Sequence, residues 1–407
     1  MYKLQNFLGD KYDRIRSIME IEYGRVSNYV NLIGSANYPF PSVLQALNTP
    51  FSANPSEGRR GHRYFPLCDS IDSLEEESER LIQKLFQCND YYCNVEPYSG
   101  TQANQIVYYA ALQKGDTVLA MTPSSGGHVS HYFYIKEFYN LIEYPLGLDG
   151  LIDYDEIQRL CKQYKPKLLI SGCSSYPRQI DYPKLSEICR KYETLLLADI
   201  SHTAIYVMTG QHSSPIGYAD FITFTTHKTT RGIRGGVVLC TRQYQKAIDR
   251  AVFPIIQGAP KFTEILAKTI MFAELDNINL NEYVQQINTI TSCFVDVFRS
   301  YGLSMLTNGT DMHIIVLDLS NKGITGSECE SLLQEQHILV NRNSIPNDKL
   351  PASTASGIRL GTLGLTSLGF TLQDAKEVAE IVAQTVVYSK SIRDAQDIMR
   401  HYSIIEQ

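Results

Sequence analysis

The sequence lacks several features that would assign it at once to a class of protein. It contains no tryptophan, no internal repeat, no low-complexity tract and no CxxC pair among its nine scattered cysteines. The formal net charge of −6 offers no basic surface to nucleic acid, and no apolar stretch is long enough to cross a bilayer. Residues 1–24 are polar with mixed charge, unlike a secretory signal. We therefore expect a cytoplasmic protein with reduced thiols, no metal site, and no nucleic-acid or membrane partner.

The sequence does contain an alternation of strand-like and helix-like segments between about residues 70 and 250. Hydrophobic residues make up 43% and charged residues 20%, which is typical of a globular protein with a sizeable core. The pattern predicts helices over residues 73–87 and 101–113, and strands over residues 116–121, 168–171, 194–198, 221–226 and 236–240. Short buried strands separated by helices favour an α/β fold with a mostly parallel sheet covered on both faces.

The pattern changes after about residue 280. Helices are predicted over residues 281–301, 327–334 and 373–388, with strands over residues 313–319 and 338–341. We therefore predict an N-terminal arm over residues 1–55, a large domain over residues 56–280 and a smaller C-terminal α+β domain over residues 281–407.

Four polar motifs stand out, and we expect each of them at the end of a strand, where α/β sheets bind ligands. The first, Ser99-Gly100-Thr101, opens a helix and offers backbone N–H groups and hydroxyls to an anion, although a simple helix N-cap is the alternative. The second is Asp199, which follows an apolar run, with His202 three residues later. A buried carboxylate needs a positive partner such as a protonated pyridine nitrogen, unless it only caps the next helix.

The third motif, Thr225-Thr226-His227-Lys228, also follows a strand. A lysine in this setting can form a Schiff base with an aldehyde cofactor, whereas most lysines are simply solvated. The fourth is Arg359 on a short strand, which suits either bidentate capture of an α-carboxylate or a structural salt bridge. A phosphate cradle, a pyridinium partner, a Schiff-base lysine and a carboxylate clamp are together what pyridoxal phosphate requires.

With these motifs in this order, the chain resembles serine hydroxymethyltransferase, of the fold-type I pyridoxal-phosphate enzymes, from about residue 31 to residue 387. The similar segments are residues 31–39, 57–64, 99–104, 126–131, 225–229 with 234–236, 341–348 and 356–362. The resemblance implies a seven-stranded, mostly parallel sheet, pyridoxal 5'-phosphate as cofactor, a small amino acid as substrate, and a homodimer with shared active sites.

The resemblance also implies a role for each matching residue. Lys228 would hold the cofactor covalently, Asp199 would keep its ring nitrogen protonated, and His128 would stack on the ring. Further cofactor contacts would come from Ser99, Gly100, Thr101, Ser174, His202, Thr225 and His227, with Gly258 reaching in from the neighbouring subunit. Substrate contacts would come from Ser35, Tyr64, Phe65, Asn343 and Arg359, and Glu57 would act as the acid/base across the dimer.

The reaction implied is reversible cleavage or transfer at the Cα–Cβ bond of serine, threonine or glycine, with tetrahydrofolate as one-carbon acceptor in the ordinary case. The chain departs from the family at Ala36, Pro55, Phe65, Pro123, Val129, Ile255, Ile256, Ala259 and Ser353, several of them on the folate side. A site that has lost the hydroxyl donor at Phe65 would disfavour a ligand that used it. A folate-independent threonine aldolase or transaldolase of specialised amino-acid biosynthesis therefore stays open, beside a catalytically silent homologue, which the retained Lys228 disfavours.

Overall fold

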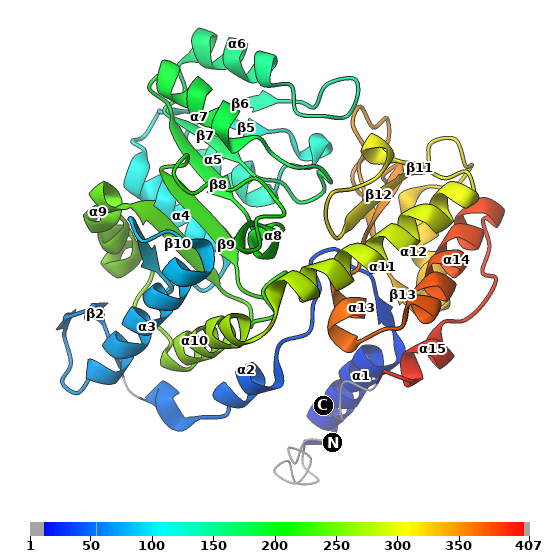
Figure 1. The fold of residues 1–407 in the computed structure, drawn as a ribbon, viewed down its shortest axis with the longest axis horizontal. Helices are drawn as coiled ribbons and strands as arrows, with labels where there is room; N and C mark the ends of the chain where they lie inside the picture. Colours follow the sequence, from blue (N-terminus) through cyan, green and yellow to red (C-terminus); the bar gives the residue numbers. More distant parts are fainter. Residues whose placement is uncertain (1–11, 54, 403–407) are drawn as a thin grey trace.

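The computed structural model describes residues 12–53 and 55–402 of the chain, and its largest feature is a seven-stranded sheet (Figure 1). The strand order is β4-β10-β9-β8-β7-β5-β6. In chain order the strands are β4 (Tyr91–Asn94), β5 (Thr117–Met121), β6 (Asn140–Tyr144), β7 (Leu168–Ser171), β8 (Leu195–Asp199), β9 (Phe221–Thr225) and β10 (Gly236–Thr241). Only β10 runs against its neighbours in this sheet, so the predicted α/β class with a mostly parallel seven-stranded sheet is confirmed.

Alternating side chains of these strands fill a core on each face of the sheet. Val118 and Ala120 of β5 join one cluster, whereas Leu119 and Met121 join the other. The first cluster is covered by α4 (Gly100–Ala111), α5 (Phe133–Phe138) and α9 (Gln245–Arg250), and the second by α3 (Asp69–Phe86), α6 (Tyr154–Tyr164), α7 (Tyr182–Lys191), α8 (Ala204–Met208) and α10 (Phe262–Asn277). The sheet is therefore the middle of three layers, as Figure 1 shows.

The segments after residue 280 form a second body around their own sheet. Helix α11 (Leu280–Ser300) follows α10 after two residues. The sheet is antiparallel in the order β11-β12-β15-β14, with strands β11 (Ser304–Met305), β12 (Ile314–Asp318), β14 (Asn341–Asn343) and β15 (Gly357–Gly361). It packs with α12 (Gly326–Glu335), α13 (Leu363–Leu368), α14 (Leu372–Tyr388) and α15 (Gln396–Arg400).

The N-terminal arm is divided between the two bodies. After α1 (Asp13–Asn28), strand β1 (Val30–Asn31) pairs in parallel with β13 (Ile338–Leu339), so this part of the arm joins the C-terminal body. Helix α2 (Pro41–Ala46) lies against α10 instead. A hairpin of β2 (Gly58–Arg59) and β3 (His62–Arg63) then precedes α3. No helix within residues 12–53 and 55–402 is both long and apolar enough to span a bilayer.

The predicted element positions hold to within a few residues where the apolar period is clear, as at β7 and α14. Strands β4 and β6 and helices α6, α7 and α10 were not predicted. β4 consists of Tyr, Tyr, Cys and Asn, all buried, while the edge strand β6 is mostly accessible, so neither shows an alternation of apolar and polar residues. The nine cysteines are all free thiols.

Candidate active site

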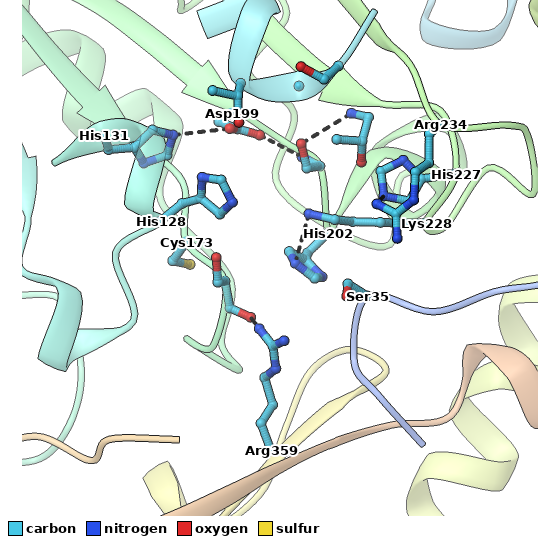
Figure 2. Close-up of a pocket in the computed structure, with 16 residues that line it drawn as sticks. Ser35, His128, His131, Cys173, Asp199, His202, His227, Lys228, Arg234 and Arg359 are labelled. Carbon is cyan, nitrogen blue, oxygen red and sulfur yellow. Dashed lines mark hydrogen bonds and ion pairs between the residues drawn. The ribbon is translucent and has the colours of Figure 1, made fainter. Parts of the chain in front are cut away.

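The carboxyl ends of the parallel strands open onto a cavity of about 250 Å³ (Figure 2). Twelve of the predicted site residues line it: Ser35, Ser99, Gly100, Thr101, His128, Ser174, Asp199, His202, Thr225, His227, Lys228 and Arg359. They come from the loops after β1, β4, β5 and β7, from β8 and β9 with the loops that follow them, and from β15 of the C-terminal body. Residues separated by more than 300 positions in the sequence, such as Ser35 and Arg359, therefore line one cavity.

Lys228 follows β9 by three residues and is buried at the centre of the cavity. The side-chain amide of Asn37 donates to its backbone carbonyl at 2.7 Å, which anchors the loop from the side of the N-terminal arm. The lysine Nζ lies 3.1 Å from Nε2 of His202. Burial lowers the pKa of Lys228 to about 8, against the opposing charge of Asp199. A fraction of the amine is therefore neutral, and so nucleophilic, near neutral pH.

His202 is backed by a second buried histidine, His313. The ring Nδ1 of His202 lies 3.5 Å from Nε2 of His313, whose Nε2 is also 3.2 Å from the carbonyl oxygen of Gly34. Because that carbonyl can only accept, the proton of His313 belongs on Nε2. Burial lowers the pKa of both rings, that of His313 to about 3. His202 thus lies between His313, on its Nδ1 side, and Lys228, on its Nε2 side.

Asp199 ends β8, and the helix that follows is preceded by Thr203, so this carboxylate is not an N-cap. Its Oδ2 accepts from Asn104 at 2.9 Å and lies 3.1 Å from Nε2 of His131, while Oδ1 accepts from the backbone N–H of Ser201 at 3.0 Å. Burial opposes ionisation, but the hydrogen bond and charge of His131 outweigh it and hold the pKa of Asp199 well below its usual range. The group is a permanently charged acceptor.

An anion site forms where α4 begins. Ser99 is the N-cap of α4, and its Oγ accepts from the backbone N–H of Gln102 at 3.1 Å, so the N-cap interpretation is correct as far as it goes. Gly100 and Thr101, in the first turn of this helix, line the cavity, and the N–H groups of a first turn have no partner within the helix. Thr225 Oγ1 and His227 Nδ1 are buried with no hydrogen-bond partner in the described part of the chain. Buried polar atoms are usually hydrogen-bonded, so these two indicate a ligand whose oxygen atoms form hydrogen bonds with them.

Two further histidines border the same space. Nδ1 of His128 accepts from the backbone N–H of Ser130 at 3.1 Å, which fixes the ring orientation. Burial lowers the pKa of His128 to about 4 and that of His227 to about 3. Both rings are therefore neutral at physiological pH and add no charge beside Lys228.

Arg359 reaches the cavity from the C-terminal body, as Figure 2 shows. Its Nη1 donates to the carbonyl oxygen of Ser174 at 2.8 Å and its Nε to Asn341 Oδ1 at 3.2 Å. No carboxylate pairs with it among residues 12–53 and 55–402, so it is not the structural salt bridge considered from the sequence. Burial lowers the pKa of Arg359 to about 10, which leaves a charged guanidinium with an open Nη2 group.

Five predicted site residues do not line this cavity: Glu57, Tyr64, Phe65, Gly258 and Asn343. Tyr64 and Phe65 are exposed, and the Asn343 amide donates to the carbonyl oxygen of Ser344 at 2.6 Å. Glu57 lies in the loop before β2, with its Oε2 buried and unpartnered in the described structure. Their roles stay predictions.

Four cavity residues were not assigned to the site from the sequence: His131, Cys173, Ser201 and Arg234. His131 and Ser201 both contact Asp199. No local pattern signals the His131 contact, which spans 68 residues, whereas Ser201 follows Asp199 by only two residues. Arg234 belongs to the glycine-rich segment over residues 231–236, and glycines that let the backbone approach a ligand closely were the available signal. In the described part of the chain, no cluster of three His, Cys, Asp or Glu side chains is arranged to hold a metal.

The arrangement agrees with a comparison against known protein families. The family model described as serine hydroxymethyltransferase matches residues 8–382, which is nearly the whole chain. The members of that family depend on pyridoxal phosphate. This chain therefore belongs to the serine hydroxymethyltransferase family.

Proposed function

We propose that this chain is a pyridoxal-phosphate enzyme that makes and breaks the Cα–Cβ bond of a small hydroxy amino acid, as in the interconversion of serine and glycine. The observation that carries the proposal is the meeting of a buried amine, a charged carboxylate and an unpaired arginine in one cavity: Lys228, Asp199 and Arg359. The family match supports the same chemistry at the level of the cofactor.

The residues present fit pyridoxal phosphate. The start of α4 and the unpartnered Thr225 Oγ1 and His227 Nδ1 provide for the phosphate group, and the amine of Lys228 provides for the aldehyde. Asp199 can accept from a protonated ring nitrogen, since its charge is maintained by His131 and Asn104. When bound, the cofactor supplies an electron sink for the pair left on Cα as the bond to Cβ breaks.

The chain's own residues would orient that step. Arg359 would bind the substrate carboxylate with its open Nη2, and Ser35 on the facing loop would add a hydroxyl. Fixing the carboxylate selects which bond at Cα stands ready to break, an effect that can lower a barrier by several kcal/mol. His202, whose Nε2 lies 3.1 Å from Nζ of Lys228, would hydrogen-bond to the group that Lys228 holds.

We also propose a homodimer in which Glu57 of one subunit serves the other. Glu57 lies outside the cavity of its own chain and carries a buried, unpartnered Oε2. Exposed apolar side chains directly follow its hairpin in the chain, namely Tyr64, Phe65 and Leu67, of which Leu67 is 90% exposed. A second copy would cover this surface and bring a carboxylate within reach of the β-hydroxyl proton.

The acceptor of the released carbon fragment distinguishes two versions of the reaction. Phe65 and Val129, which stand at folate-side positions of the family, are 42% and 57% exposed and carry no hydrogen-bonding group. This favours weak folate binding and keeps a folate-independent aldolase or transaldolase as the second candidate.

The test is product analysis by the purified protein with serine, threonine and glycine, each with and without tetrahydrofolate. Serine cleavage that depends on folate supports the hydroxymethyltransferase, whereas aldehyde release or aldehyde addition without folate supports the second candidate. Borohydride reduction followed by peptide mapping should mark Lys228, and Lys228→Ala should be colourless. Labelling of a different lysine would contradict both candidates, and an inert protein with a labelled Lys228 would favour a silent homologue.

A further inference from the structure

A second buried lysine, Lys268 on α10, lies outside the cavity and is 1% exposed. Its Nζ donates to the carbonyl oxygens of Val95 at 2.7 Å, Pro97 at 2.8 Å and, more weakly, Gly236 at 3.4 Å. Its hydrogen bonds therefore end on neutral backbone atoms. The carboxylates of Glu264 and Glu96 favour its charge only through space. A buried cation without a contacting counter-ion is unfavourable unless an anion binds nearby.

The carbonyls that hold Lys268 belong to the segments that build the anion site. Pro97 precedes the N-cap Ser99 by two residues, and its carbonyl also accepts from the backbone N–H of Gly236 at 2.9 Å. Gly236 lies so close to Ser99 that a Cβ there would collide with the Ser99 carbonyl oxygen. The ammonium group thus joins the end of β4, the start of α4 and the start of β10 behind the cradle.

The neighbouring glycine shows that the space for this lysine is specific. A Cβ on Gly235 would collide with Cε of Lys268 and lie 2.9 Å from Thr226 Oγ1. The Gly235-Gly236 pair after Arg234 therefore admits both the lysine and the Ser99 turn. Burial lowers the pKa of Lys268 to about 8, so the group is largely charged at neutral pH despite its surroundings.

We propose that Lys268 is a positioning residue for the cofactor, a buried counter-charge that holds the cradle of the phosphate group from behind without touching it. This rests on the proposed function, which places that phosphate at Ser99, Gly100 and Thr101. Arg234 at the cavity wall is exposed, so water and salt screen its charge. The charge of Lys268 is not screened in this way, and its field acts through protein rather than solvent.

The experiment compares the affinity of apoenzyme for pyridoxal 5'-phosphate with that for pyridoxal, which has the aldehyde and ring but no phosphate. Binding is followed by the absorbance of the bound aldehyde. Lys268→Met removes the charge, and Lys268→Gln removes it while keeping amide donors for the carbonyls. We expect both variants to lose about tenfold or more in their preference for the phosphorylated form, with little change in pyridoxal affinity.

Lys84→Met is the control, since Lys84 lies on α3 with a side chain that is 59% exposed and pairs with Asp276 of α10. The preference of this control variant for pyridoxal 5'-phosphate over pyridoxal should equal that of the wild type. If the folded Lys268 variants keep the wild-type preference for pyridoxal 5'-phosphate over pyridoxal, the proposal is wrong. Lys268 would then serve only to hold the backbone carbonyls together. Failure of both variants to fold would also overturn it, because the lysine would then serve the fold regardless of cofactor. If the wild type bound neither aldehyde, the proposed function itself would fail.

Discussion

Nζ of Lys228 lies 3.1 Å from Nε2 of His202, at the end of a chain that runs through His313 to the carbonyl oxygen of Gly34. The Gly34 carbonyl oxygen lies 3.2 Å from Nε2 of His313, and the same Nε2 lies 3.5 Å from Nδ1 of His202. Burial lowers the pKa of both rings, so they are neutral and add no positive charge beside Lys228.

The first prediction concerns the pH at which apoenzyme captures pyridoxal phosphate. Only neutral amine attacks an aldehyde, and burial lowers the pKa of Lys228 to about 8. The capture rate should rise with pH through about 8 and level off above it. Stopped-flow absorbance between pH 6.5 and 9.5 checks this, with Lys228→Ala as the blank. A rate still rising steeply at pH 9.5 would show an ordinary lysine.

The second prediction concerns Asp199→Asn. The amide has nearly the same shape but cannot balance a cationic ring nitrogen, so turnover should fall by about 10² or more. Asp220→Asn is the control. Asp220 directly precedes β9, at the end of that strand away from the cavity, and it accepts from the backbone N–H of Leu196. Steady-state rates at saturating cofactor decide the matter. Equal rates for the two variants would remove Asp199 from the chemistry.

The charge of Asp199 gives the same prediction a pH dependence. Its pKa is depressed by His131 and its other neighbours despite burial, so it should stay ionised throughout the range in which the protein is folded. The wild-type rate should show no loss near pH 4 to 5 from this group, whereas an ordinary aspartate would begin to protonate there.

The third prediction concerns Arg359→Lys. The lysine keeps the charge but loses the planar fork, so KM for serine should rise about tenfold with a smaller change in kcat. Arg342→Lys on the neighbouring strand β14 is the control, since its partner Glu330 lies on the surface. An unchanged KM in Arg359→Lys would mean that the substrate carboxylate binds elsewhere.

The fourth prediction concerns the hairpin that bears Glu57. Arg63 is buried against Asp72, Glu75 and Glu96, and its Nη1 also donates to the carbonyl oxygen of Gly58 at 2.7 Å. Removing the cation leaves the buried carboxylates without a positive partner. Arg63→Met should therefore lower the free energy of unfolding by about 3–5 kcal/mol.

Urea denaturation of that variant measures the change, and Arg80→Met is its control. Arg80 pairs with Glu77 on the exposed face of α3 and should have no measurable effect on stability. Similar midpoints for the two variants would show that the network around Arg63 does not hold the hairpin.

Local pattern was sufficient for the parts of the site that lie next to strand ends. Asp199 and Lys228 follow apolar runs that read as strands, and parallel strands end at one edge of a sheet, so their convergence could be predicted. Arg359 could be proposed as a clamp, but only the structure shows that no carboxylate in the described chain competes for it.

What the sequence by itself determined is the α/β class, the order of the motifs and the choice of Lys228 as the candidate amine. Only the tertiary structure decided what surrounds them: His131 beside Asp199, His313 behind His202, and Lys268 against the carbonyl of Pro97 before α4. The physical reason is that charge and protonation depend on burial and on partners distant in sequence. Periodicity and spacing describe neighbours along the chain, whereas a pKa or a tautomer is set by neighbours in space.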